Sequence, residues 1–130
     1  MTLITNNKIV ANNYFLDSIY YDLAVSNIFI ENEKDALILL NKALLSSKIQ
    51  KKYKVEYDCI SSMFEIYYKR EDYEKLNELK ILLLELLSKS NKHEFHTLVY
   101  EYIKMYDKQG KRAELEDLVN FMINLNKKAV

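Results

Sequence analysis

The chain contains no proline and no tryptophan, and Gly110 is the only glycine among its 130 residues. Proline and glycine are the residues that most often end helices and form tight turns. Their near absence permits long helices and leaves β-hairpin turns largely unencoded. A single glycine also excludes a glycine-rich phosphate-binding loop, which needs several. The composition therefore favours an all-α fold.

The chain also has only one cysteine, Cys59, and no net charge. A single cysteine excludes an internal disulfide, and a buried thiol is compatible with the reducing cytoplasm. Because 19 basic residues balance 19 acidic ones, no overall field draws the chain towards nucleic acid or an anionic membrane. No apolar run approaches the roughly 18 residues of a membrane-spanning helix, and the segment 1–12 is too polar for a secretory signal. We therefore expect a flexible N-terminal segment and a cytoplasmic protein, with neither nucleic acid nor a membrane as its partner.

What the sequence does contain is a helix–turn–helix pattern that occurs three times, with a shift of about 40 residues between copies. The equivalent positions are Tyr20, Leu23, Ala24, Asn27, Ala36, Leu40 and Ala43; then Ile60, Met63, Phe64, Tyr67, Leu76, Lys80 and Leu83; then Val99, Tyr102, Ile103, Tyr106, Leu115, Val119 and Met122. Periods of this length are typical of stacked helical hairpins, which bind partners on a surface. We therefore predict one domain over 13–130, with six helices in three antiparallel hairpins at about 13–48, 53–89 and 91–126.

Capping residues predict where these helices begin and end. Asn13 is a suitable N-cap for the first helix, and Asp72 for the fourth. Asn32 with Asp35, and Asn91 with Glu94, have the spacing of capping boxes. Gly110 suits the left-handed end of the fifth helix. The stripe expected to face the core in the first helix consists of Leu16, Ile19, Tyr20, Leu23 and Asn27.

The fourth helix is apolar on almost every side over the segment 81–87. Such a helix has to be covered on more than one side, which a central place in a stack would provide. The alternative is that part of this leucine-rich surface is exposed and forms a dimer contact. Phe121 and Ile123, beside the main stripe of the last helix, also lead us to expect that the last hairpin contributes to self-association.

The first copy of the pattern resembles the tetratricopeptide repeat, through Tyr20, Leu23, Ala24, Ala36, Leu40 and Ala43. The later copies keep the spacing but carry large residues where that family has small ones. The longer period and the missing proline are similar to the repeat domains of peptide-sensing regulators of Gram-positive bacteria. The resemblance implies a right-handed superhelix that binds a protein or a short peptide as the sensor or adaptor part of a bacterial regulator. The alternative is a structural or homo-oligomerisation domain, such as a homodimer, that uses the leucine-rich helices.

In this family the first helix of each hairpin lines the concave surface. The resemblance therefore places nine binding residues there: Tyr21, Val25 and Ile28; Ser61, Glu65 and Tyr68; and Tyr100, Lys104 and Asp107. Tyrosine rings would provide apolar contact, while Glu65 and Lys104 would orient a peptide backbone or its termini. The alternative interpretation is that all nine are ordinary surface residues of a helical bundle.

Residues that carry chemistry are sparse. His93 and His96 are close in the sequence, but a zinc site needs three or four ligands, and Cys59 lies on another helix. Cys59 is therefore expected to be a small buried thiol. The lysines of 48–54 would suit phosphate, although solvated lysines at a helix junction are the commoner case. We predict a protein that is not an enzyme and that uses no cofactor and no metal.

Overall fold

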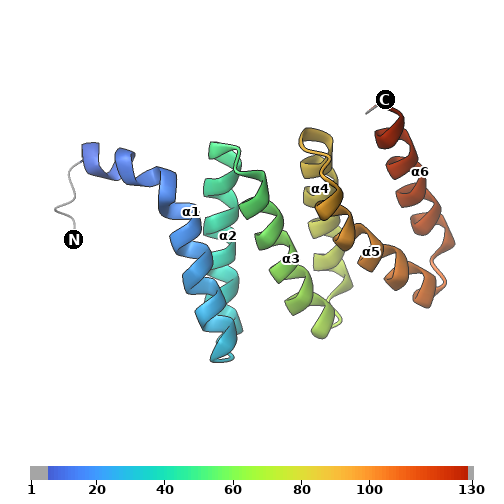
Figure 1. Cartoon of the computed structure of the whole chain (residues 1–130). Coiled ribbons are helices and arrows are strands. Elements are labelled where there is room, and N and C mark those ends of the chain that lie inside the picture. Colours follow the sequence, from blue (N-terminus) through green and yellow to red (C-terminus); the bar gives the residue numbers. More distant parts are fainter. Residues whose placement is uncertain (1–5, 129–130) are drawn as a thin grey trace. The chain divides into compact units, whose positions relative to one another are not determined.

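The computed structural model describes the backbone of residues 6–128 and the side chains of residues 15–128. Within this part of the chain there are six α-helices, one short 3-10 helix and no strand. They are α1 (Asn6–Phe29), α2 (Glu33–Gln50), α3 (Tyr53–Lys69), α4 (Tyr73–Lys89), η1 (His93–Phe95), α5 (His96–Gln109) and α6 (Arg112–Lys128). The predicted all-α class is confirmed, and the helices follow one another as consecutive pairs (Figure 1). None of these described helices is long and apolar enough to cross a membrane.

The loops inside the three hairpins share one backbone geometry, and they recur at the shift seen in the sequence. In these loops the residues with a left-handed backbone are Glu31, Glu71 and Gly110, whose φ angles are 60°, 54° and 69°; Lys51, between α2 and α3, has the same conformation, with a φ of 57°. The amides that follow belong to Asn32, Asp72 and Lys111, and they donate to the carbonyls of Asn27, Tyr67 and Tyr106 at 2.8, 3.0 and 2.9 Å. These bonds satisfy carbonyls that the last turn of a helix leaves free. The prediction that Gly110 ends α5 is confirmed.

The start of the first helix was predicted too late. α1 begins at Asn6 and not near Asn13, because no proline or glycine stops the helix from extending through these turns. Residues 6–12 of the N-terminal segment are therefore helical, and residues 1–5 lie outside the described part of the chain. At the fourth helix the prediction is confirmed, since the amide of Lys75 donates to Oδ1 of Asp72 at 3.2 Å.

Neither predicted capping box forms. The side-chain amide of Asn32 donates to Oδ2 of Asp35 at 2.8 Å and to Oδ1 of Asn27, so it is not a cap for the backbone of α2. Asn91 contacts the His96 ring, and η1 precedes α5. A short polar side chain can form hydrogen bonds with several nearby groups, and the spacing of residues in the sequence does not show which of these bonds forms.

The described part of the chain divides into two compact units, Met1–Leu84 and Glu85–Val130. In the first unit α1 packs against α2, and α3 packs on both of them. Ala24, Ala36 and Ala43 have no exposed surface, and these small side chains let the helix backbones approach closely. Leu40 and Ile60 complete this core.

The core stripe predicted for the first helix is partly wrong. Ile19 and Leu23 are 48% and 49% exposed, whereas Asp17 and Ala24 are fully buried. Asp17 tolerates burial because its carboxylate lies 3.0 Å from the ammonium of Lys52, at the start of α3. Apolar periodicity identified an amphipathic helix but did not identify which side its neighbours cover.

In the second unit α5 packs against α6, and η1 packs on α5. Its buried side chains include Phe95, Leu98, Tyr102 and Tyr106, with Leu118 from α6. The boundary between the units falls within α4, the leucine-rich helix. Its predicted burial is confirmed for Leu76, Leu79, Leu83, Leu86 and Leu87, whereas Leu82 and Leu84 are half-buried and Ile81 is exposed.

Candidate groove between α5 and α6

The second unit contains a groove of about 300 Å³ between α5 and α6. It is lined from α5 by His96, Val99, Tyr100 and Ile103, and from α6 by Val119, Met122, Ile123 and Asn126. On each helix these residues have the spacing i, i+3, i+4, i+7, which defines one helical face. Two matched faces therefore form a trough with an apolar floor and three polar groups on its walls.

The groove offers side chains that a partner could cover. Val99 is buried at its base, while Ile103, Val119 and Met122 are partly exposed. Tyr100 and Ile123 are the most open of the lining residues that are apolar or aromatic. Aromatic rings with a polar tip are common at protein interfaces because they combine apolar area with a hydrogen-bonding group. This arrangement suits an apolar protein segment better than a small polar substrate.

The titratable group in the groove is held in its neutral form. Nε2 of His96 lies 2.6 Å from Oδ1 of Asn91, and the ring of His93 meets the His96 ring edge-on at 5.4 Å between centroids. Burial, and secondly the nearby charge of His93, lower the pKa of His96 below its ordinary 6.5. This shift favours the neutral imidazole, and the residues that line the groove include no Asp, Glu, Lys or Arg.

The corresponding surface of the first hairpin is occupied by a helix. His96, Ile103, Val119, Met122 and Asn126 correspond to Asp17, Ala24, Leu40, Ala43 and Ser47, and all five of these counterparts are fully buried. There α3 packs on α1 and α2, with Lys52 bound to Asp17 and the hydroxyls of Tyr21 and Ser62 3.4 Å apart. The groove has larger residues, Ile103 and Met122, in place of two alanines.

A smaller cleft, of about 290 Å³, lies at the turn between α5 and α6. Tyr106, Asp107, Gly110, Arg112 and Leu115 line it. Asp107 and Arg112 are charged and exposed, so the lining of this cleft is more polar than that of the groove.

Six of the predicted binding residues lie in the first unit. Tyr21, Val25, Ile28 and Ser61 are partly buried, and Tyr21 contacts α3 through Ser62. Glu65 is exposed. Tyr68 is also exposed, and its ring stacks on Phe64 at 5.5 Å between centroids.

The other three lie on α5, and the structure does not bring them to one site. Tyr100 lines the groove, whereas Asp107 lines the cleft at the turn. Lys104 is exposed and pairs with Glu101 at 2.9 Å. Sequence reasoning did not place the other lining residues, His96, Val99, Ile103, Val119, Met122 and Asn126, in a binding site, and it named Ile123 only for self-association. The matching i, i+3, i+4, i+7 faces of the last two helices are the signal that would have found them.

The reactive and basic residues singled out in the sequence have structural partners. Burial, and then the nearby Asp58, Asp17 and Glu56, raise the pKa of the Cys59 thiol from an ordinary 9.0 to about 12, so it is not a nucleophile at neutral pH. Lys52 pairs with Asp17, and Lys54 pairs with Asp58 at 3.1 Å. These pairs favour a structural role for Lys52 and Lys54 over phosphate binding.

Neither metal ligands nor known relatives point to another function. Within the described residues no group of three His, Cys, Asp or Glu side chains is placed to hold a metal ion. Comparison with protein-family models, with curated proteins and with solved structures finds no match for the chain. The geometry of the groove is therefore the main guide to function.

Proposed function

We propose that the chain is a non-catalytic protein-binding module whose α5–α6 groove receives an apolar helical segment of a partner. The observation that carries this proposal is the internal correspondence between the groove and the first hairpin. The same positions of the first hairpin hold a helix, α3, whereas in the groove they are partly or fully exposed and three of the five, Ile103, Val119 and Met122, are apolar. A surface that binds a helix in one copy of the pattern is suited to bind one in another.

The lining of the groove defines the chemistry of the partner. Its two faces each extend over eight residues, so they span about 10 Å, or two helical turns. A matching helix needs apolar side chains at i, i+3 or i+4, and i+7. Because Ile103 and Met122 replace two alanines, the helix must lie further from the hairpin than α3 does, and medium or large side chains are needed to reach the floor. Charged residues on that face would be unpaired among neutral lining residues.

A wider form of the proposal follows from the resemblance to tetratricopeptide repeats. In this form a peptide binds the first helices of the hairpins in the first unit, through Tyr68, Glu65 and Val25, and the chain acts as the sensor or adaptor of a bacterial regulator in the cytoplasm. The exposed ring of Tyr68 supports this form. Tyr68 does not line the α5–α6 groove, so it distinguishes the two forms.

The test is selection of binding peptides on the purified chain. A phage-displayed library of peptides of about 16 residues is long enough to span two turns with flanks. We expect selected sequences to have apolar residues at helical spacing. Ile123→Glu and Tyr100→Ala should each weaken their binding by about 10- to 100-fold in fluorescence anisotropy, because each removes an apolar contact at the groove.

Ile81→Glu is the matched control, since Ile81 is an equally apolar, exposed residue of α4 that does not line the groove. Its affinity for the peptides should equal that of the wild type. Loss of affinity in Tyr68→Ala but not in Ile123→Glu would move the site to α3. Unchanged affinity in all the variants would refute both forms.

A further inference from the structure

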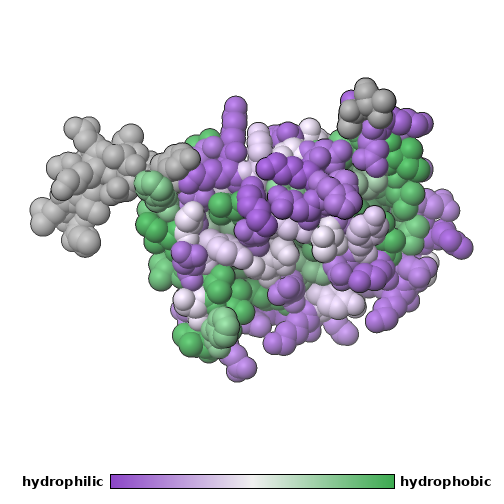
Figure 2. Space-filling view, viewed as in Figure 1, coloured by the Kyte–Doolittle hydropathy of each residue, from purple (hydrophilic) through white to green (hydrophobic). Residues whose placement is uncertain are grey.

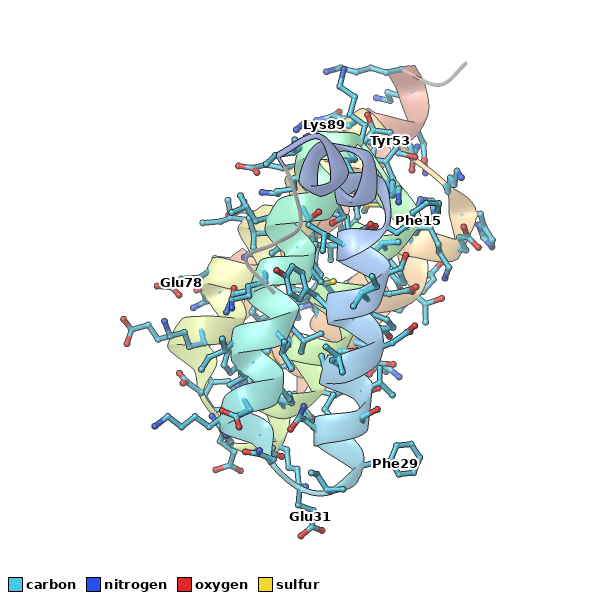
Figure 3. All side chains as sticks on the ribbon, turned by 90° about the vertical axis from the view of Figure 1, so that its left-hand side faces the viewer. Phe15, Phe29, Glu31, Tyr53, Glu78 and Lys89 are labelled. Atoms are coloured by element: carbon cyan, nitrogen blue, oxygen red, sulfur yellow. The ribbon has the colours of Figure 1, made fainter. Side chains whose placement is uncertain are left out.

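The outer face of the first hairpin is apolar and open to solvent. We call it the first-hairpin face, and it consists of Ile19 and Leu23 of α1 with Ile38, Leu45 and Ile49 of α2. These side chains are 48% to 74% exposed. Spacings of four on α1, and of seven and four on α2, place each set on one side of its helix. Figure 3 looks at α1 and α2 from this end, and Figure 2 shows apolar side chains along the edge over α1.

A contact between α1 and α2 places both sets on the same side of the hairpin. Lys42 lies four residues after Ile38 and three before Leu45, so it belongs to the exposed stripe of α2. Its ammonium lies 5.8 Å from the centre of the Tyr20 ring on α1. Tyr20 is next to Ile19 and three residues before Leu23. The two stripes therefore meet along the line where the helices touch.

The apolar character of α2 is particular to the first hairpin. The counterparts of Ile38, Leu45 and Ile49 are Glu78, Glu85 and Lys89 on α4, and Asp117, Asn124 and Lys128 on α6; all six are polar and exposed. The fold of a hairpin in this chain therefore does not require apolar residues at these positions. On α2 they expose three aliphatic side chains to water.

The two residues of α1 belong to a different class. The counterparts of Ile19 and Leu23 are Cys59 and Met63 on α3, and Leu98 and Tyr102 on α5; all four are buried. These positions are therefore buried in both of the later hairpins. On α1 they are left half exposed, next to the apolar stripe of α2.

We infer that the first-hairpin face binds the same face of a second copy of this chain, giving a two-fold symmetric dimer. Its five residues expose roughly 400 Å² of apolar side-chain surface, taking about 140 Å² for a fully exposed aliphatic side chain. One side of a stable interface buries about 800 Å², of which a little over half is apolar. The face thus supplies the apolar share that one side of such a dimer needs.

Charge also favours a second copy as the partner. The charged residues of α1 and α2 that lie three or four positions from these five apolar residues are Asp22 and Asp35, which are negative, and Lys34, Lys42 and Lys48, which are positive. The whole chain carries 19 positive and 19 negative side chains. Neither the face nor the chain therefore repels its own copy, and a face of mixed sign can pair with itself in an isologous contact.

The experiment replaces α2 residues with those that the chain itself carries at the same positions of α4. The triple variant Ile38→Glu, Leu45→Glu, Ile49→Lys changes exposed side chains only, and circular dichroism should show wild-type helix content. Sedimentation equilibrium of the wild type should give twice the chain mass, with a dissociation constant in the micromolar range. The triple variant should dissociate at least about 100-fold more readily, because it places four Glu and two Lys across the interface.

Ile81→Glu is again the matched control, because Ile81 is 58% exposed on α4 and lies outside the first-hairpin face. It should dimerise as the wild type does. A wild type that remains monomeric at several hundred micromolar would overturn the inference. So would a triple variant with an unchanged dissociation constant, or a wild type that grows beyond the dimer with concentration.

Discussion

The carboxylate of Asp17 lies 3.0 Å from the ammonium of Lys52, across the contact between α1 and α3, and Asp17 has no exposed surface. Its second oxygen, Oδ2, is buried without a hydrogen-bond partner among the described residues. Lys52 is still in partial contact with water. A buried carboxylate depends strongly on its one counter-charge, because the cost of removing it from water is not offset elsewhere.

We therefore expect Lys52→Met to lower the free energy of unfolding by about 2–3 kcal/mol, less than for a fully buried pair because Lys52 is partly hydrated. Urea unfolding followed by circular dichroism measures this change. Lys54→Met is the matched control, since it breaks the exposed pair with Asp58 and should cost less than about 1 kcal/mol. Equal losses in the two variants would show that burial of Asp17 does not matter.

Cys59 should react slowly while the chain is folded. Burial and three nearby carboxylates raise the pKa of its thiol to about 12, and only the thiolate attacks alkylating reagents. At pH 8.5 iodoacetamide should modify the native chain at least about 100-fold more slowly than the urea-unfolded chain. Mass spectrometry over time measures both rates. Comparable rates would place Cys59 at the surface.

The same shift predicts a loss of stability at high pH. The thiol has a higher pKa in the folded chain than in the unfolded chain, so the folded chain retains the proton longer. This contribution to stability is fully present below pH 9 and decreases as the pH rises from 9 towards 12. In Cys59→Ala the free energy of unfolding should fall less steeply over this range. Parallel pH profiles for the two proteins would contradict the prediction.

Substitutions at two left-handed turn residues, Gly110 and Glu71, should change the stability of the chain in opposite directions. Gly110 has a φ of 69°, and an added Cβ would meet nothing within 4 Å, so Gly110→Ala has only a conformational cost of about 1 kcal/mol. Glu71 has a φ of 54° without being glycine. Glu71→Gly should therefore stabilise the chain by about 0.5–1 kcal/mol. Thermal unfolding of both variants checks the signs, and a stabilising Gly110→Ala would show that the turn is built differently.

His96 should make the fold sensitive to acid. Burial and the nearby charge of His93 lower its pKa, so the folded chain favours the neutral ring. The contribution of His96 to the free energy of unfolding is fully present above the pKa of the unfolded chain, about 6.5. It is lost as the pH falls through the lower pKa of the folded chain. In His96→Gln the free energy of unfolding should depend less on pH between 7.5 and 5. The matched control, His93→Gln, retains His96 and should keep most of the dependence, and an unchanged slope in His96→Gln would exclude this residue as its source.

Particular residues show which predictions from the sequence were correct and which were wrong. The threefold pattern predicted six helices in pairs, and the equivalent turns at Glu31, Glu71 and Gly110 agree with its spacing. Those features depend on the backbone preferences of neighbouring residues and on periodicity, and both can be read from the sequence. The capping boxes were wrong because Asn32 and Asn91 each had a second partner within reach. The core stripe predicted for α1 was partly wrong because burial depends on how neighbouring helices pack against α1.

The groove was found only in part. Tyr100 was predicted as a binding residue, but from a resemblance that placed it on a concave surface with Lys104 and Asp107. In the structure Tyr100 lines the same groove as Met122 and Ile123 of the next helix. Which residues of two helices face each other depends on how far each helix is rotated about its axis. Packing sets that rotation, and spacing within one helix does not contain it.

The amino-acid sequence is enough to predict that the chain is helical, where most of its helices begin and end, and that its charges balance. These properties follow from the absence of proline, from periodicity and from composition. The packing of the helices against one another is what buries Asp17, leaves Ile19 and Leu23 exposed, and forms the groove between α5 and α6. The physical reason is that burial is a relation between elements distant in the chain, and Asp17 and Lys52 meet only when α3 packs on α1.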